Sequence, residues 1–277
     1  MDKLTRKERI VFLTTEFIKN AGRVYSLSEF CQLFSCAKST LSEDLQIIKN
    51  AFSKGGQGEL LIKPGKNGGV KYMPFMNMDF EKEFLENTAK VFCDKNRILP
   101  GGFIYITDVL LNTDTLKPIG EILASRFRHL HIDYIVTAET NGISVALSVA
   151  QVLKKPVVIA RRLSKIIEGS IVTINYLSGT TRKLQTISIA KRAMLPKKKA
   201  LIIDDFIAGG GTVRAISDMV NEFDVSVEGI GCVISTMYPE KKKVKGFESL
   251  FTLYEVDEEN QIIRLLPNIH ENSTLGK

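Results

Sequence analysis

The sequence predicts two folded parts: a small helical domain that ends in a β-hairpin, and a larger α/β domain with a mostly parallel sheet. Apolar stripes at helical spacing, followed by two short β-prone runs, occupy the first 76 residues. From residue 101 onward, short apolar runs alternate with helical segments. Such alternation is typical of a parallel sheet covered by helices on both faces. We therefore predict domains at residues 1–76 and 77–277.

Charge distinguishes the same two parts. Residues 1–76 contain 12 Lys and Arg against 7 Asp and Glu, so they carry +5 of the chain's formal net charge of +7. The rest of the chain is nearly balanced. A small basic domain is the electrostatic footprint of nucleic-acid binding, which makes a nucleic acid the expected partner.

The first two helices are predicted from apolar spacing and from start and stop signals. Residues 8–20 place apolar side chains on one helical face, and Gly22 follows as a stop. Ser26, with Glu29 three residues later, forms a capping-box pattern that opens a second helix ending near Phe34. Both helices are expected to be short and amphipathic.

A third helix and a hairpin complete the small domain. The third helix opens at Lys38 or Ser39, and its apolar residues form one stripe. Two β-prone runs, ELLIK and GVKYM, flank PGKNGG, whose Asn-Gly pair is a strong hairpin-turn signal. Three helices and a hairpin make a winged helix-turn-helix domain.

This domain is predicted to bind duplex DNA, with the third helix in the major groove and the hairpin as a basic wing. The alternatives are an ordinary solvated surface, or a winged helix that contacts protein. The predicted DNA-binding residues are Arg6, Lys38, Ser39, Thr40, Ser42, Lys63, Lys66 and Lys71.

The larger domain is expected to open with an amphipathic helix at residues 79–96, which joins it to the winged helix. Strands are expected within residues 101–110, 133–144, 156–162, 197–206 and 226–236, the last of which closes the series. Helices are expected at 119–131, at 145–153 and after Thr212, and a β-rich excursion at 170–189. Ligands of such sheets bind at the carboxyl ends of the strands.

One motif stands at such a strand end. In LIIDDFIAGGGTVRA, residues 201–215, an apolar strand ends in Asp204 and Asp205, and three glycines lead to Thr212. The glycines let the backbone approach an anion, and the helix that starts at Thr212 offers free N–H groups and a positive dipole end. The two carboxylates suit the vicinal hydroxyls of a ribose. The motif therefore predicts a site for a phosphorylated sugar.

ALIIDDFIAGGGTV, residues 200–213, resembles the phosphoribosyl pyrophosphate (PRPP) motif of type I phosphoribosyltransferases, and the resemblance extends over roughly residues 99–239. The family's pyrophosphate loop maps onto residues 137–146 and its flexible loop onto residues 174–185. With the winged helix included, the whole chain is similar to the purine operon regulators of Gram-positive bacteria, down to ILPGGFIYITD, KIIEGSIVTINYLSG and PGKNGGVKY.

This resemblance implies a homodimeric transcription factor that binds double-stranded DNA upstream of purine genes and senses PRPP without turning it over. It leaves repressor or activator open, and an activator would also contact RNA polymerase. Asp204 and Asp205 would accept ribose hydroxyls. The resemblance assigns the 5′-phosphate to Ala208, Gly209, Gly210, Gly211 and Thr212, and the pyrophosphate to Glu139, Thr140, Asn141 and Gly142. Arg161 and Arg162 follow the strand at 156–160 at its ligand edge and could also meet the pyrophosphate; an ordinary solvated pair is the alternative.

Aromatic side chains would complete the effector site. The resemblance puts Phe103 and Tyr105 near the base pocket and Phe206 beside the ribose, so a guanosine polyphosphate could compete by stacking. A place in the core is the alternative for Tyr105. Mg²⁺ could bridge the pyrophosphate to the pocket, but the sequence shows no protein cage for a metal, so we assign no metal ligand and no catalytic residue.

Sensing is favoured over catalysis. Phosphoribosyltransferases usually carry a Thr before the paired glycines of the phosphate loop, whereas this chain has Gly209 and loses a hydroxyl donor. The basic domain also has no obvious use in an enzyme. The alternatives are an active purine phosphoribosyltransferase with an appended nucleic-acid-binding domain, and an RNA-binding regulator.

Other features exclude some protein classes. The four cysteines lack paired spacing, so we expect neither a disulfide framework nor a zinc site. No apolar run reaches the roughly 18 residues of a membrane span, and MDKLTRKERI lacks the apolar region of a signal peptide. We expect a cytoplasmic, nucleoid-associated protein without a membrane partner.

Overall fold

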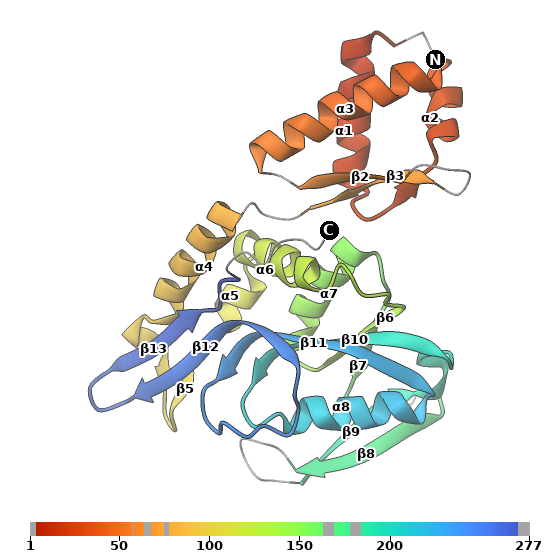
Figure 1. Ribbon diagram of the computed structural model, residues 1–277. Helices are drawn as coiled ribbons and strands as arrows, with labels where there is room; N and C mark the ends of the chain where they lie inside the picture. The colour runs from red at the N-terminus through yellow and green to blue at the C-terminus, as the bar shows by residue number, and fades with distance from the viewer. Residues whose placement is uncertain are drawn as a thin grey trace. The chain divides into compact units, whose positions relative to one another are not determined.

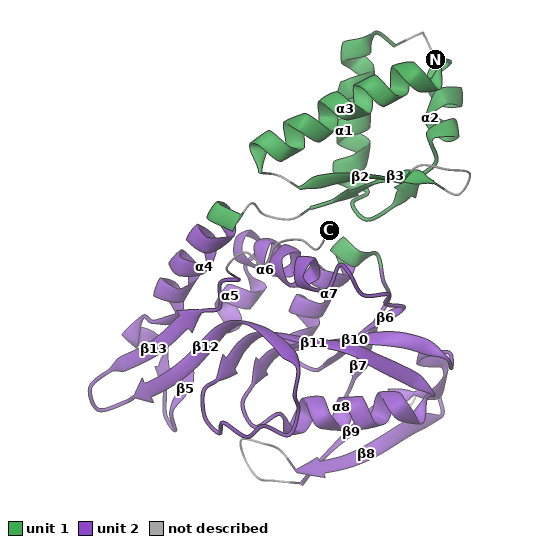
Figure 2. Cartoon of the chain, in the orientation of Figure 1, with its two compact units in different colours: residues 1–80, 151–154 green, residues 81–150, 155–277 purple. Residues whose placement is uncertain are grey.

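The computed structural model describes residues 4–56, 58–63, 68–74, 78–162, 169–177 and 184–270. They form two compact units (Figure 2). Unit 1 comprises Met1–Phe80 and Gln151–Lys154, and unit 2 comprises Glu81–Ala150 and Lys155–Lys277. The elements of the small basic part belong to unit 1, and every strand of the larger sheet belongs to unit 2.

Unit 1 has, in its described residues, the helices and hairpin that the sequence predicts (Figure 1). Its three strands form an antiparallel sheet in the order β1-β3-β2. The elements are α1 (Arg6–Lys19), β1 (Val24–Tyr25), α2 (Leu27–Phe34), α3 (Lys38–Gly55), β2 (Glu59–Lys63) and β3 (Gly69–Met73). Residues 64–67, at the expected turn, lie outside the described residues.

The capping box of unit 1 lies on α1, not on α2 as predicted. Thr5 accepts a hydrogen bond from the Glu8 amide, and the Glu8 carboxylate accepts one from the Thr5 amide at 2.8 Å. Ser26 does cap α2, but its hydroxyl accepts from the Ser28 amide. The Ser26 and Ser28 hydroxyls also contact each other.

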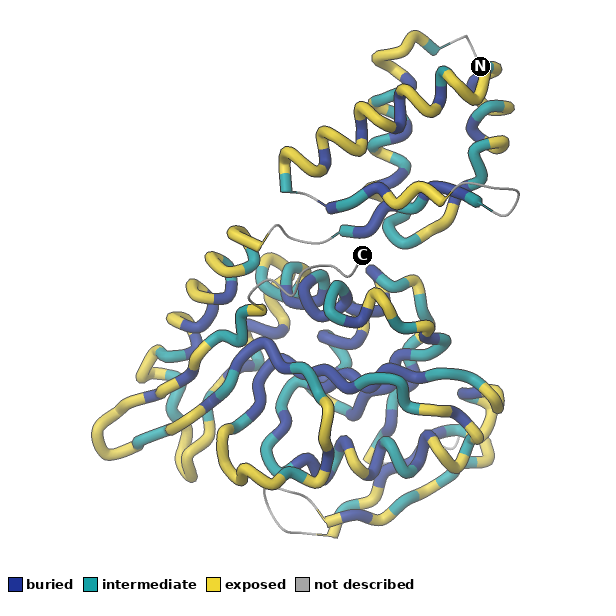
Figure 3. Tube along the Cα trace, in the orientation of Figure 1, coloured by how far each residue is buried: buried dark blue, intermediate teal, exposed yellow. Residues whose placement is uncertain are grey.

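The core of unit 1 joins all three helices to the sheet. Leu13, Phe17, Leu41 and Leu45 are at most 1% exposed, and Phe17 meets Phe30 edge to face with ring centres 5.8 Å apart. These side chains recur at the helical spacing of the sequence, and Figure 3 shows the buried positions alternating with exposed ones along each helix. The apolar stripes therefore pack as expected.

Unit 2 is built on a six-stranded sheet in the order β13-β12-β11-β10-β6-β7, parallel except for the β12–β13 pair. The strands are β6 (Tyr134–Ala138), β7 (Val157–Ala160), β10 (Lys198–Ile207), β11 (Val225–Thr236), β12 (Phe247–Asp257) and β13 (Ile262–Pro267). The helices are α4 (Met78–Phe92), α5 (Thr107–Leu111), α6 (Thr113–Arg126), α7 (Gly142–Leu153) and α8 (Gly211–Glu222).

Helices cover the sheet on both faces, as predicted. Figure 1 shows α6 and α7 on one face and α8 on the other. Ala200 and Ile202 of β10 join the core cluster that contains Ile216 of α8. Burial on both faces of the sheet explains why the central strands read as continuous apolar runs.

Arg126, at the end of α6, joins distant parts of unit 2. Its guanidinium donates to the carbonyl of Ser249 at 2.9 Å and to the carbonyl of Asn268 at 2.7 Å, and it pairs with Glu81 at 3.4 Å. The Arg126 side chain is only 5% exposed. A buried charge with this many acceptors fixes the helix, the β12 strand and the end of the described chain together.

The structure corrects several sequence-based elements. Residues 101–110 are not one strand, because β5 (Phe103–Ile104) pairs only with the short β4 (Ile98–Leu99) and α5 follows. The series also does not close at residue 236, since β12 and β13 extend the sheet. Finally, α4 ends at Phe92, where the expected helix continued to Asn96. Asp94 there accepts from the Asn96 amide and starts a separate 3₁₀ turn.

Candidate functional site

The candidate effector site lies where β10 and β6 end. The two strands are parallel neighbours, with Ile202 opposite Val136, so their carboxyl ends meet at one edge of the sheet. The β10 strand continues into the glycine loop and α8, and β6 continues into the turn before α7. The structure therefore places the predicted phosphate and pyrophosphate loops on adjacent strands.

The phosphate loop offers a run of unpaired amides. Within the described residues, the backbone N–H groups from Ala208 through Val213 donate to no protein acceptor. These residues line a hollow together with Asp204 and Phe206. No side chain caps α8, and its N-cap Gly210 has φ +75°, where an added Cβ would lie 2.9 Å from the Val244 side chain. Successive free amides at a helix N-terminus form an anion-binding nest.

Asp204 and Asp205 differ in their surroundings. Asp204 is 5% exposed, and its Oδ1 accepts a hydrogen bond from the Asp205 amide at 3.1 Å. Burial, with the neighbouring charge of Asp205, raises the pKa of Asp204 well above its usual range. Asp205 is only half-buried. Asp205 is therefore the more accessible acceptor for a ligand hydroxyl. Asp204 lies deeper, at the floor of the hollow that it lines.

The pyrophosphate loop touches this floor. A Cβ added at Gly142, the first residue of α7, would lie 2.9 Å from Asp204 Oδ1 and 2.5 Å from Thr137 Oγ1. Only glycine allows this approach. The Glu139–Thr140 peptide bond is cis. The two sequence-predicted loops, separated by some 60 residues in the chain, therefore meet directly at Gly142 and Asp204.

The Glu139 and Asn141 side chains of the pyrophosphate loop already have protein partners. The Glu139 carboxylate accepts from the Arg162 amide at 3.1 Å and lies 3.6 Å from the Arg161 guanidinium. Asn141 donates to Thr107 Oγ1 at 3.4 Å. Arg161 therefore contacts the loop through an ion pair with Glu139, and its contact with pyrophosphate stays a prediction.

The predicted aromatic residues lie at the surface or half-buried. Phe103 and Tyr105 are 47% and 45% exposed, so the alternative that Tyr105 belongs to the core is wrong. Thr107, two residues beyond Tyr105, contacts Asn141 and ties this segment to the pyrophosphate loop. Phe206 is half-buried and lines the hollow.

Sequence reasoning missed two residues that contact the phosphate loop. Tyr176, on the β8 (Ile171–Leu177) strand of the predicted flexible loop, has its hydroxyl 3.4 Å from Thr212 Oγ1. Lys242 donates to the carbonyl of Ala208 at 2.9 Å. Tyr176 lies within the predicted flexible loop, but no pattern singles it out, and Lys242 lies outside every predicted motif; the tertiary contacts identify both residues. The β8 strand pairs with β9 (Leu184–Ala190), and residues 178–183 between them lie outside the described residues.

The candidate DNA surface is at the N-terminus of α3. Lys38, Ser39 and Ser42 are exposed, Thr40 is half-buried, and the N-cap Ala37 makes no side-chain hydrogen bond to the helix. The Ser42 hydroxyl donates to the Lys38 carbonyl at 2.9 Å, which leaves its oxygen free to accept. This helix start therefore presents polar groups and open amides to solvent.

The other predicted DNA contacts are less uniform. Lys63 is exposed on β2, and Lys71 is half-buried on β3. Lys66 lies outside the described residues. Arg6 donates to Glu43 and to Asp44, at 3.1 Å in each case, so its charge is already partly neutralised within the unit.

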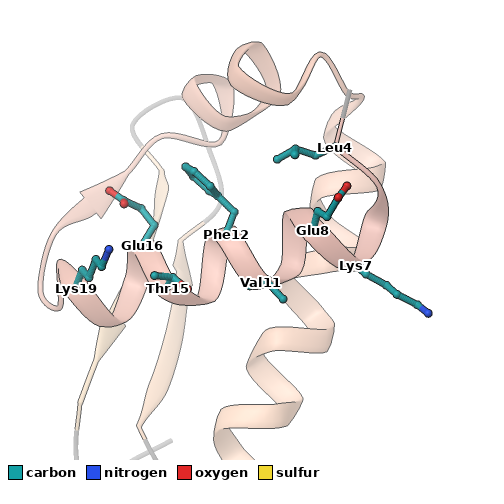
Figure 4. A pocket seen from close by; sticks show the side chains of 8 residues that line it. All are labelled: Leu4, Lys7, Glu8, Val11, Phe12, Thr15, Glu16 and Lys19. Carbon is teal, nitrogen blue, oxygen red and sulfur yellow. The ribbon is translucent and has the colours of Figure 1, made fainter. Parts of the chain in front are cut away.

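A second hollow of about 560 Å³ follows the outer side of α1 (Figure 4). Apolar Val11 and Phe12 form its middle, and one lysine and one glutamate lie toward each end of the helix: Lys7 and Glu8 at the start, Glu16 and Lys19 at the end. It offers no converging set of anion-binding groups. The groove therefore does not match a nucleotide site.

Two further findings concern the described residues alone. They contain no group of three or more His, Cys, Asp or Glu side chains placed to hold a metal ion. None of their helices combines the length and the apolar character that a bilayer span requires.

Comparison with known proteins supports both predicted domains. Residues 5–74 match the family model for the N-terminal domain of the bacterial purine repressor, and residues 107–266 match the phosphoribosyl transferase domain. The chain is 38% identical to the purine biosynthesis transcriptional repressor PurR of Bacillus subtilis, over 95% of this chain and 92% of that protein. The chain belongs to the PurR family of purine biosynthesis regulators. The expected resemblance and fold class are confirmed.

Members of this family carry different names. The chain is 33% identical to the purine biosynthesis transcriptional activator PurR of Lactococcus lactis, over 94% of this chain and 96% of that protein. It is also 30% identical to xanthine phosphoribosyltransferase of Ligilactobacillus salivarius, but over 53% of this chain and 79% of that enzyme. The adenine phosphoribosyltransferase of Thermoanaerobacter pseudethanolicus, solved as a crystal structure, shares the fold, with a TM-score of 0.53, 22% identity, and coverage of 61% of this chain and 99% of that one.

Proposed function

We propose that the chain is a DNA-binding regulator of purine biosynthesis genes whose transferase-like unit senses PRPP without turning it over. The observation that supports this proposal most is the run of unpaired amides at residues 208–213 beside Asp204 and Asp205. The amides suit a 5′-phosphate, and the carboxyl groups suit the two ribose hydroxyls.

The pyrophosphate would bind across the same ribose. Gly142 lies against Asp204, so a ligand that contacts the floor also reaches the amides of the 139–142 turn. Arg161 would turn from Glu139 toward the anion, exchanging one ion pair for another. Mg²⁺ would accompany the pyrophosphate, held by its oxygens and by water. A guanosine polyphosphate would compete for the phosphate loop, with Phe103, Tyr105 or Phe206 stacking on its base.

The DNA contacts would come from α3 and the hairpin. Lys38, Ser39 and Ser42 are exposed at a helix start whose amides no side chain caps, so these groups would be available to DNA if the helix enters the major groove. The resemblance to purine operon regulators implies a homodimer, whose two winged helices would contact paired half-sites on the DNA. We expect the protein in the cytoplasm. One relative is named a repressor and another an activator, so either sign of regulation is compatible, and an activator would also contact RNA polymerase.

The effector site and the DNA-binding surface would be coupled by thermodynamic linkage. PRPP that binds the DNA-competent and DNA-incompetent states with different affinities changes DNA affinity by the same factor. A coupling of about 1–3 kcal/mol alters DNA affinity roughly 5- to 150-fold.

An active purine phosphoribosyltransferase is the second candidate, favoured by the identity to xanthine phosphoribosyltransferase. Gly209 weighs against it, since this position offers an amide but no hydroxyl to the phosphate. Incubation with PRPP and purine bases would detect nucleotide formation. An RNA-binding regulator would instead prefer a structured leader to duplex DNA.

Fluorescence anisotropy tests the proposal. A labelled duplex from upstream of a purine gene is compared with a scrambled duplex at about physiological salt, because non-specific binding depends steeply on salt. PRPP is then titrated into the wild type, Asp205→Asn and the exposed control Glu222→Gln. Selective binding that responds to PRPP in the wild type and the control, but not in Asp205→Asn, supports the sensor. Equal weak binding to both duplexes, unchanged by PRPP, contradicts it.

A further inference from the structure

The segment between β11 and β12 braces the phosphate loop. Lys242 Nζ donates to the carbonyl of Ala208 at 2.9 Å, to the carbonyl of Pro239 at 3.1 Å and to Thr236 Oγ1 at 3.3 Å. The Lys243 amide donates to the carbonyl of Gly209 at 3.0 Å. Two consecutive carbonyls of the loop are thus held by two consecutive residues of this segment.

Peptide geometry gives these bonds a directional consequence. In a trans peptide unit the C=O of one residue and the N–H of the next point in opposite directions. Fixing the Ala208 and Gly209 carbonyls toward the 239–244 segment therefore turns the amides of Gly209 and Gly210 away from it. Those amides belong to the run that has no protein acceptor and that lines the hollow.

The ammonium group of Lys242 also fits this place chemically. Each carbonyl that pointed into the hollow would repel a phosphate, and three oxygen acceptors hold the ammonium where it prevents this. Lys242 is half-buried, and burial lowers its pKa. The neighbours Lys241 and Lys243 are exposed. Of these three lysines, Lys242 is the one whose side chain donates to the loop.

We propose that Lys242 is a positioning residue of the effector site, which orients the amides of the glycine loop by holding the Ala208 carbonyl away from the bound 5′-phosphate. The inference rests on the proposed binding of PRPP and adds a residue that lies outside both predicted loops. Lys242 touches the loop and not the ligand, so it acts through peptide orientation.

Calorimetric titration of Lys242→Met tests the inference with three probes: PRPP, ribose 5-phosphate and inorganic pyrophosphate. Methionine keeps much of the side-chain length and removes the donors. We expect affinity for PRPP and for ribose 5-phosphate to fall about tenfold, as for a lost charged hydrogen bond. Pyrophosphate, which needs only the 139–142 turn, should change less than twofold. Lys241→Met removes the same charge one residue away, from an exposed side chain that does not contact the loop, so it should change all three affinities less than twofold.

Lys242→Arg retains donors and should recover part of the lost affinity, which a general packing defect would not allow. Unfolding midpoints and DNA affinity of each variant, measured without effector, report on folding. Wild-type affinity for ribose 5-phosphate in Lys242→Met overturns the inference, and so does an equal loss for all three probes. A wild type that binds neither PRPP nor ribose 5-phosphate overturns the proposed function itself and this inference with it.

Discussion

The starts of α3 and α8 lack a side-chain cap, as does that of the five-residue α5, whereas α1, α2 and α6 are capped by Thr5, Ser26 and Asn112. Uncapped helix starts leave N–H groups available for a phosphate. The α3 start is exposed and follows Ala37, and the α8 start follows a glycine loop around a hollow. The same backbone chemistry thus suits a long polyanion in one place and a small phosphate ester in the other.

The largest expected effect comes from filling the α8 start. Gly210→Ala would place a Cβ 2.9 Å from Val244 in a backbone with φ +75°, so the loop must shift and its amides lose their alignment. We expect affinity for PRPP to fall about 100-fold, as for the loss of a preorganised set of donors, while DNA binding without effector persists. Calorimetry measures the first effect and anisotropy the second.

Gly246→Ala is the matched control, because Gly246 also has positive φ, at +65°, but an added Cβ meets nothing within 4 Å. It carries the same conformational cost of about 1–2 kcal/mol and should leave PRPP affinity nearly unchanged. Equal losses of PRPP affinity in both variants would show that backbone strain, and not the shape of the loop, explains the effect.

Removing a positive charge tests whether the N-terminus of α3 binds DNA. Lys38→Ala should weaken DNA binding and reduce the slope of log affinity against log salt by about 1, as for one lost phosphate contact. Lys49→Ala removes an exposed lysine from the same helix, farther from its start. If both variants lower the slope alike, the helix does not bind DNA through its N-terminus.

The two helix starts also differ in the charge of the neighbouring side chains. The carboxyl groups of Asp204 and Asp205 precede α8, whereas Lys38 is the first residue of α3. Because the pKa of Asp204 is raised in the folded state, the unfolded chain loses this proton first as the pH rises. The free energy of unfolding therefore falls from about pH 3.9 upward through the folded pKa. Asp204→Asn should lack this loss. At higher pH the variant should therefore have a larger free energy of unfolding than the wild type. The difference should be about 1.4 kcal/mol for each tenfold increase in proton affinity that Asp204 gains on folding.

Thermal unfolding of the effector-free wild type and Asp204→Asn at pH 4 and pH 8 checks this. The stability difference should favour the variant more at pH 8 than at pH 4. A difference that is independent of pH would mean that Asp204 titrates alike in the folded and unfolded chain.

The smallest expected effect comes from adding a side-chain cap to α3. Ala37→Ser would give α3 the side-chain cap that it lacks, and should stabilise the unit by about 0.5–1 kcal/mol. The serine oxygen would occupy an amide that we assign to DNA phosphate, so DNA affinity should fall by a few-fold. A stabilised variant with unchanged DNA affinity would remove the α3 amides from the interface while leaving Lys38 in place.

Much of the fold was predictable because its signals are local. The stripes of α1 and α3, the Asn-Gly hairpin and the apolar run of β10 each fix one element from a few residues. The short β5 was not predictable, since Phe103 and Ile104 are β-prone but the next residues form α5. The β12 and β13 strands were missed, although their apolar residues alternate in part with exposed polar ones.

The candidate site likewise has parts that the sequence predicts and parts that it does not. Asp204, Asp205 and residues 208–212 could be predicted, because strand, carboxylates, glycines and helix are contiguous in sequence. The pairing of Arg161 with Glu139 and of Arg6 with Asp44 could not, because each depends on side chains that the fold brings together. Lys242 lies 34 residues from the carbonyl that it holds, and no spacing rule predicts that bond.

The acceptors around Arg126 have a consequence for synthesis on the ribosome. The guanidinium requires Glu81, Ser249 and Asn268, which span nearly the whole of unit 2. A nascent chain that stops before Asn268 leaves this cation short of an acceptor, so unit 2 completes its fold only after residue 268 has been synthesised. The winged helix, whose last strand ends at Met73, can fold much earlier, as N-terminal domains generally do. The winged helix would therefore form during translation before unit 2 is complete.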